Sequence, residues 1–236
     1  MTFNKQITIS SYMLLLRHPI GSLSKAIGGL SKPSKMPWFS YSIPAQRCRI
    51  GSILRKKVGS TCSKCYALKG RYVFENVIKA LEHRYQLLIS SPEAWAACFA
   101  GLLEKKAKGL EQWFRWHDAG DLQGLWHLEA IVWIAERLPN IHFWLPTREL
   151  PTVKEYVDKH GDFPANLMVR WSASSINGTP FLSQRLKDAG VTTSSVGDVL
   201  KIETDSVVCP ANRNEGKCGS CRACWKSKLN VNYPLH

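Results

Sequence analysis

The chain has 236 residues, of which 44% are hydrophobic and 21% are charged, a composition typical of a globular protein with a buried core. No apolar run approaches the ~20 residues that a membrane-spanning helix needs, and eight cysteines are too few for a small disulfide-stapled scaffold. The net charge is +14 and unevenly distributed, because residues 1–74 contain thirteen Lys and Arg but no Asp or Glu.

Local sequence patterns predict one folded domain after a basic N-terminal segment. Residues 1–36 are rich in Ser, Gly and Lys, so we expect a weakly structured segment there. Residues 37–236 should form a single α/β domain that binds a cluster, because strand and helix patterns alternate along them. Strands are expected at 38–43, 113–117, 141–146 and 167–171, with a last short strand ending at Val208. Helices are expected at 74–89, from Pro92 with Ser91 as the cap, and at 122–138, 151–160 and 179–189.

The number of strands limits the fold. Five or six strands are too few for an eight-unit barrel. We therefore expect a partial (β/α) barrel or an open, mostly parallel sheet, followed by a Cys-rich C-terminal segment. In such folds, sites form at the carboxyl ends of the strands.

Polar residues follow three of the expected strands and are candidates for chemistry. His117 is the expected proton carrier, because imidazole titrates near neutral pH, and Asp118 or Asp121 could orient it. Strand alternation predicts that His117 shares a face with Arg115 while Asp118 points to the opposite face. The alternative is ordinary loop polarity, with His117 as a structural histidine. The full candidate set is His117, Asp118, Asp121 and Arg148 for catalysis, and Arg115, Thr147, Arg170 and Ser172 for binding a carboxylate, phosphate or cofactor.

Seven of the eight cysteines fall into two groups whose spacing predicts metal ligands. The first group is Cys48, Cys62 and Cys65, and the second is Cys209, Cys218, Cys221 and Cys224. The run C-x2-C-x2-C with a distant Cys-Pro resembles the spacing of the cysteines that bind [4Fe–4S] clusters in bacterial ferredoxins. A four-thiolate zinc site is the alternative, although zinc ribbons usually use two separated C-x2-C pairs.

The number of clusters is left open by the spacing. Three thiolates in the first group would leave one iron of a cluster open to water, substrate or cofactor, as catalytic zinc keeps an open position. Alternatively, the two groups share one cluster and leave spare thiols. Cys98 lies within an expected helix and is interpreted as a small buried residue.

Parts of the chain resemble the phage gene product 88 family. The resemblance is carried by residues 43–45 with Cys48, and by residues 62–72, 115–121, 209–211 and 216–225. It implies a virus-encoded iron–sulfur protein of poorly defined function.

A looser similarity is to radical S-adenosylmethionine enzymes, which combine a partial barrel with a three-cysteine cluster after the first strand. It implies that S-adenosylmethionine could be a cofactor. The chain departs from that pattern in two places. Thirteen residues separate Cys48 from Cys62 where that family usually has three, and His117-Asp118 stands where a Gly-Gly-Glu motif would follow the second strand.

Two reaction types and two partner classes follow from these expectations. An open iron could act as a Lewis acid for hydrolysis, for example of esters, or a reduced cluster could pass an electron to a bound cofactor. The basic residues 1–74 indicate an anionic partner, so the alternative function is a structural iron–sulfur or zinc protein that binds nucleic acid. We also expect a small-molecule substrate and no membrane span. The expected location is a reducing cytoplasm, that of an infected host cell.

Overall fold

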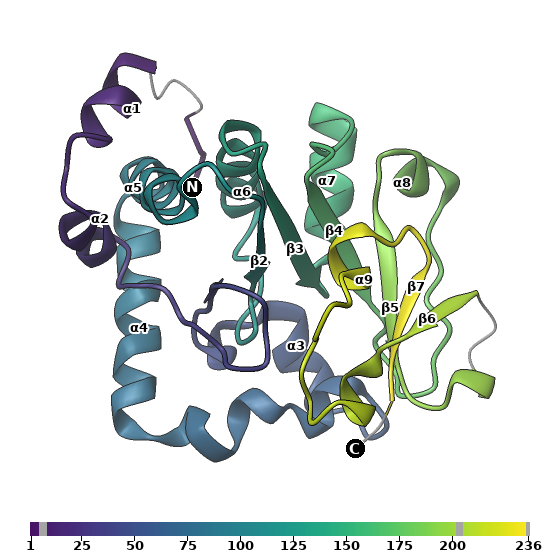
Figure 1. Cartoon of the computed structure of the whole chain (residues 1–236). Helices are drawn as coiled ribbons and strands as arrows, with labels where there is room; N and C mark the ends of the chain where they lie inside the picture. The colour runs from purple at the N-terminus through teal and green to yellow at the C-terminus, as the bar shows by residue number, and fades with distance from the viewer. Residues whose placement is uncertain (5–8, 202–204, 235–236) are drawn as a thin grey trace.

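The computed structural model describes residues 1–4, 9–201 and 205–234, and its centre is one parallel β-sheet (Figure 1). In these residues the sheet has seven strands in the order β1-β2-β3-β4-β5-β7-β6. This confirms the expected open, parallel α/β sheet. The strands are β1 (Ser40–Tyr41), β2 (Gln112–Trp116), β3 (Ile141–Thr147), β4 (Leu167–Ser172), β5 (Thr192–Val196), β6 (Ser206–Val208) and β7 (Asn230–Tyr233).

The longer helices connect successive strands, as the alternating pattern predicted. Four of them match the expected helices closely: α4 (Glu75–Ser90), α5 (Pro92–Ala107), α6 (Leu125–Arg137) and α7 (Leu150–His160). Ser91 is the cap of α5, but its side chain makes no capping hydrogen bond. The shorter helices are α1 (Ile9–Leu15), α2 (Ile20–Ala26), α3 (Arg49–Leu54), α8 (Gln184–Asp188) and α9 (Ala223–Lys226).

Alternation along the strands gives the sheet two different faces. On one face, Phe114, Phe143 and Val169 belong to the main core, together with residues of α5 and α6. On the other face, Trp144 packs with Trp225 of the C-terminal segment. We call this second side the inner face, and the C-terminal Cys-rich segment covers it.

Three segments differ from the sequence expectation. The N-terminal residues expected to be weakly structured include α1 and α2, and Leu23 and Ile27 are buried against the main core. Helix α8 covers only the end of the expected 179–189 helix. Strands β5 and β7 were not expected, so the strand at Val208 is not the last one.

Polar side chains join the unexpected strands. Asn230 Nδ2 donates to the Oγ atoms of Ser195 and Ser206, both at 2.8 Å, and Ser195 Oγ donates to Asn232 Oδ1 at 3.1 Å. Polar side chains that bond to one another take the place of apolar ones in this part of the sheet. Its sequence therefore lacks the apolar pattern that predicts a buried strand. In the described ranges, no helix is both long and apolar enough to cross a membrane.

Candidate functional site

The first thiol group lies on a segment that crosses the carboxyl ends of the strands. Cys48 precedes α3, and Cys62 and Cys65 lie within and just after a 3-10 helix, η2 (Thr61–Lys64). An antiparallel bridge between Ser60 and Ser175 joins this segment to the chain that follows β4. All three thiols are partly exposed. The group therefore lies at the edge of the sheet where parallel α/β folds bind ligands.

The sulfur atoms of Cys48 and Cys62 face the same glycine. A Cβ atom on Gly51 would lie 3.6 Å from the Cys48 Sγ and 3.7 Å from the Cys62 Sγ. Burial raises the pKa of the Cys48 thiol, and the nearby Cys65 and Cys62 raise it further. The three thiols thus stand together in space although thirteen residues separate the first two.

Positive charge accompanies these thiols. Burial raises the pKa of Cys62, whereas Arg148 lowers it both as a nearby charge and through a hydrogen bond. The charge of Arg55 lowers the pKa of Cys48, against the larger effect of burial. Because the thiolate is the form that binds metal, both guanidinium groups favour metal ligation.

Asp121 connects the segment after β2 to the end of β3. Its Oδ1 accepts hydrogen bonds from Thr147 Oγ1 at 2.6 Å and Leu122 N at 2.8 Å, and its Oδ2 accepts from Arg148 N at 2.8 Å. Burial raises the pKa of this carboxyl group to about 6 despite these bonds. The charge of Asp121 also raises the pKa of Cys48. Three of the expected site residues, Asp121, Thr147 and Arg148, therefore form one connected unit beside the first thiol group.

Arg148 extends this unit to the end of β4. Its Nη1 donates to the carbonyl oxygen of Ser172 at 2.9 Å and also to that of Ala173. The hydroxyl of Ser172 accepts from Ser194 Oγ at 3.1 Å. Arg148 and Ser172 thus lie at the same sheet edge, as expected, but both already have protein partners.

Asp118 holds the thiol-bearing segment and does not orient His117. Its Oδ2 accepts from the Tyr72 hydroxyl at 2.7 Å, its Oδ1 accepts from Ser42, and its carbonyl oxygen accepts from the Tyr66 hydroxyl at 2.5 Å. Both tyrosines follow Cys65 in the chain. The expected Asp118–His117 pair is absent, because both ring nitrogens of His117 lack a hydrogen-bond partner among the described residues.

His117 is buried and turned away from the inner face. Its φ angle of 51° interrupts the alternation of β2, and its ring packs against His127 of α6 at a centroid distance of 5.2 Å. The expectation that it shares a face with Arg115 is therefore not met. Burial, assisted by the charge of Arg115, lowers its pKa to about 3, so it does not titrate near neutral pH.

This buried histidine predicts acid sensitivity. The folded-state pKa of His117 lies below the ordinary value of 6.5, so its contribution to stability is present above pH 6.5 and is lost as the pH falls. The substitution His117→Asn, which tolerates a positive φ angle, should remove a slope of about 1.4 kcal/mol per pH unit from the free energy of unfolding below pH 6. Urea unfolding at pH 7, 6 and 5 measures this slope. The exposed His18→Asn is the control, and equal slopes for His117→Asn and wild type would contradict the prediction.

The second thiol group lies at the inner face of the sheet. Cys209 follows β6 directly, Cys218 and Cys221 lie in the connection to β7, and Cys224 belongs to α9. Burial raises the pKa of Cys218, and the nearby Cys209 and Cys221 raise it further. Burial also raises the pKa of Cys224 to about 11, although the Tyr233 hydroxyl lies 3.3 Å from its sulfur.

Arg170 fixes the segment around Cys224. The side chain is fully buried. Its terminal nitrogens donate to four carbonyl oxygens, those of Thr193 at 2.7 Å, Leu229 at 3.0 Å, Ser227 at 2.7 Å and Ala223 at 3.2 Å. The expected role of Arg170 in binding a carboxylate or phosphate is therefore not supported, because the ligand would have to displace these bonds.

Arg115 lies between the two thiol groups. Its Nη2 donates to the Tyr66 hydroxyl at 3.1 Å, and its guanidinium carbon lies 4.5 Å from the ring centroid of Trp144. Its charge also lowers the pKa of Cys218 and Cys224, against the larger effect of burial. Arg115 is thus positioned to offset negative charge at the second group, and it contacts the first group's segment through Tyr66.

The arrangement of ligands bears on the type of metal. Four thiolates around one zinc ion would lie about 3.8 Å apart, because each Zn–S bond is about 2.3 Å. In the ranges that the structure describes, no three His, Cys, Asp or Glu side chains are arranged to hold a metal ion. This geometry favours neither zinc nor an iron–sulfur cluster, so the type of metal stays a prediction.

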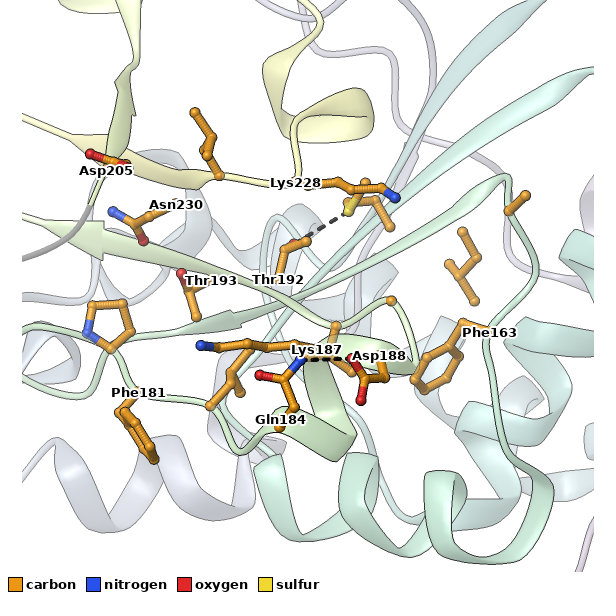
Figure 2. A pocket seen from close by; sticks show the side chains of 18 of the residues that line it. Phe163, Phe181, Gln184, Lys187, Asp188, Thr192, Thr193, Asp205, Lys228 and Asn230 are labelled. Atoms are coloured by element: carbon orange, nitrogen blue, oxygen red, sulfur yellow. Dashed lines mark hydrogen bonds between the residues drawn. The ribbon is translucent and has the colours of Figure 1, made fainter.

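A cavity of about 840 Å³ lies elsewhere in the molecule (Figure 2). It is lined near the first residues of three strands, including Met168, Thr192 and Asn230. Figure 2 shows Lys187 and Asp188 on one side of it. None of the seven grouped cysteines and none of the expected site residues line this cavity. The thiols and the polar residues around them, not this cavity, define the candidate site.

Several residues of the site were not expected from the sequence. Glu149 is buried and accepts a hydrogen bond from the backbone N of Ile50, beside Cys48, at 2.8 Å. Tyr66 and Tyr72 position Asp118, and Tyr233 contacts Cys224. The sequence offered signals for three of these residues. Tyr66 directly follows Cys65, Tyr72 ends the segment 62–72 that carries the family resemblance, and Glu149 ends the polar run after the expected strand at 141–146. It offered none for Tyr233.

Comparison with known proteins identifies one family. A family model described as Gene product 88 matches residues 15–227, which include both thiol groups. No curated protein and no solved structure matches the chain.

Proposed function

The chain belongs to the gene product 88 family, and we propose that it is a virus-encoded iron–sulfur enzyme with two separate clusters. The observation that carries this proposal is the presence of two distinct thiol groups, three thiols at the carboxyl edge of the sheet and four at its inner face. Three closely spaced cysteines with a remote Cys-Pro resemble the ligands of four-iron clusters.

The arginines near both thiol groups would stabilise negatively charged iron–sulfur clusters there. Arg55 and Arg148 lie beside the first group, and Arg115, Arg170 and Arg222 beside the second. Cluster thiolates carry negative charge, and buried charge is stabilised by opposite charges nearby. A Cβ atom at Gly51 would occupy the space beside two sulfur atoms, so the glycine keeps room for a group larger than the thiols.

We place catalysis at the first group. With three thiolates, a bound four-iron cluster has one iron that can bind substrate or cofactor, as a Lewis acid or as a source of one electron. Asp121 could hold or release a proton there, because burial raises its pKa to about 6. Arg148 and Thr147 fix the position of this carboxyl group.

The redox reaction is the first candidate. The three-thiol segment follows β1, as in radical S-adenosylmethionine enzymes, so we propose S-adenosylmethionine as the first cofactor to test. Hydrolysis is the second candidate, and the observation in its favour is the raised pKa of Asp121, since His117 is buried and uncharged near neutral pH.

Metal analysis tests the proposal. Protein purified without oxygen should be brown and contain about eight irons and about eight sulfides per chain, as two four-iron clusters require. Adding S-adenosylmethionine should change the electron paramagnetic resonance spectrum of the reduced first cluster. A hydrolase would leave that spectrum unchanged and would cleave small esters. Colourless protein that contains zinc and lacks sulfide would overturn the proposal.

A further inference from the structure

Exposed cations flank the cysteines of the first thiol group along the chain. Lys64 stands between Cys62 and Cys65, and Lys69 and Arg71 follow within the next six residues. We define the basic rim as the exposed cations that flank these cysteines in the sequence, namely Arg49, Lys56, Lys57, Lys64, Lys69 and Arg71. Figure 1 shows α3 beside the arrowhead of β3, so the segment that bears part of the rim lies where this strand ends.

The charge of the basic rim is not neutralised by its own protein. In the described part of the chain, no hydrogen bond or ion pair engages the side chains of Lys64, Lys69 and Arg71. The two nearest acids along the chain have other partners: Glu75 pairs with Lys79 at 2.5 Å, and Glu82 with Arg47 at 2.8 Å. The rim therefore presents concentrated positive charge to a partner.

Exposed aromatic and apolar side chains are interspersed with these cations. Tyr66 is 56% exposed and Phe74 is 57% exposed, which is unusual for side chains of this size. Next to them lies a hollow of about 300 Å³. It is lined by Pro44, Gln46, Arg47, Ala67, Tyr72, Ile78, Leu81 and Glu82. Cations, exposed rings and an apolar hollow thus lie on one surface.

We propose that the basic rim binds single-stranded nucleic acid and brings it to the first thiol group. The cations match the phosphates, and Phe74 and Tyr66 offer faces on which unpaired bases stack. In a duplex the bases are already stacked on one another, so the exposed rings favour a single strand. An acidic protein would match the charge but would leave these rings without stacking partners. The delivery of a strand to the thiols depends on the proposed function, whereas the binding itself does not.

Charge removal tests the binding. Fluorescence anisotropy should compare wild type with the triple variant Lys64→Gln, Lys69→Gln, Arg71→Gln, using labelled oligothymidine and an RNA of equal length. Each lost phosphate contact reduces the salt slope of log K by about 0.7 for a single strand, so three contacts reduce it by about 2. By the same relation, binding at 0.1 M salt should weaken about 100-fold. The control is Lys154→Gln, Lys187→Gln, Lys228→Gln, which removes equal charge at exposed lysines outside the rim and should bind like wild type.

A second variant separates nucleic acid from an acidic protein. Phe74→Ala should weaken oligothymidine binding at least about fivefold, because one stacked base is lost, and should leave binding of polyglutamate unchanged. Equal affinity of wild type for polyglutamate and oligothymidine would overturn the proposal in favour of an acidic protein. Equal losses in the two triple variants would overturn the role of the rim. Oligothymidine binding should be measured on protein with and without bound iron. The rim charges are present in both forms, so failure of the cluster proposal would not by itself remove binding.

Discussion

Replacing Arg170 by methionine should destabilise the protein by about 4 kcal/mol. The guanidinium group is fully buried and donates to four carbonyl oxygens, three of which belong to the segment around Cys224. Each buried acceptor that loses its donor costs about 1–3 kcal/mol, and methionine fills much of the volume without offering a donor. Chemical denaturation followed by tryptophan fluorescence measures the loss, because Trp225 packs beside this segment.

Two further variants make this test specific. Arg170→Lys keeps the charge but not the planar arrangement of donors, so it should recover only part of the stability. Arg185→Met is the control: this side chain is 62% exposed and pairs with Asp158 at the surface, so its loss should cost less than about 1 kcal/mol. If Arg170→Met proved as stable as Arg185→Met, the four hydrogen bonds would not anchor the segment.

The part of the fold that depends on apolar patterns was predictable from the sequence. Helix α6 and strands β2, β3 and β4 stand out because their buried positions carry large apolar side chains. Strands β5 and β7 were missed because Ser195, Asn230 and Asn232 occupy their buried positions and bond to one another. A polar interior of this kind looks like a loop until its hydrogen-bond partners, far away in the sequence, are known.

The candidate site was predictable where it depends on residue type and spacing. Cys62 and Cys65 affect the pKa of Cys48, and Asp121, Thr147 and Arg148 meet at the sheet edge, whereas metal ligation by the cysteines stays a prediction. The environment of each side chain was not predictable. The positive φ angle of His117 turns its ring toward α6, and the carbonyl oxygens around Arg170 come from distant segments. These are tertiary effects that strand alternation does not contain.

Reducing either group to two cysteines should remove iron from that group alone. Cys62→Ser should lower the iron content by about four per chain, and the double variant Cys218→Ser, Cys221→Ser should lower it by a similar amount, because two thiolates are too few to retain a four-iron cluster. The reason to expect independent losses is the separation of the thiols into two groups, with Arg115 between them. Iron and acid-labile sulfide, measured on protein purified without oxygen, give the result directly.

The remaining cysteine provides the matched control. Cys98 is a partly buried side chain of α5 that packs against the main core, and Cys98→Ser should keep the full iron and sulfide content. Cys62→Ser should also abolish any spectral response to S-adenosylmethionine, whereas the double variant Cys218→Ser, Cys221→Ser should keep it, because the three thiolates of the first group are intact in that variant. If either substitution removed all the iron, the two groups would share one cluster. In that case no three-thiolate site would exist at the sheet edge, and the catalytic proposal would fail together with the two-cluster proposal.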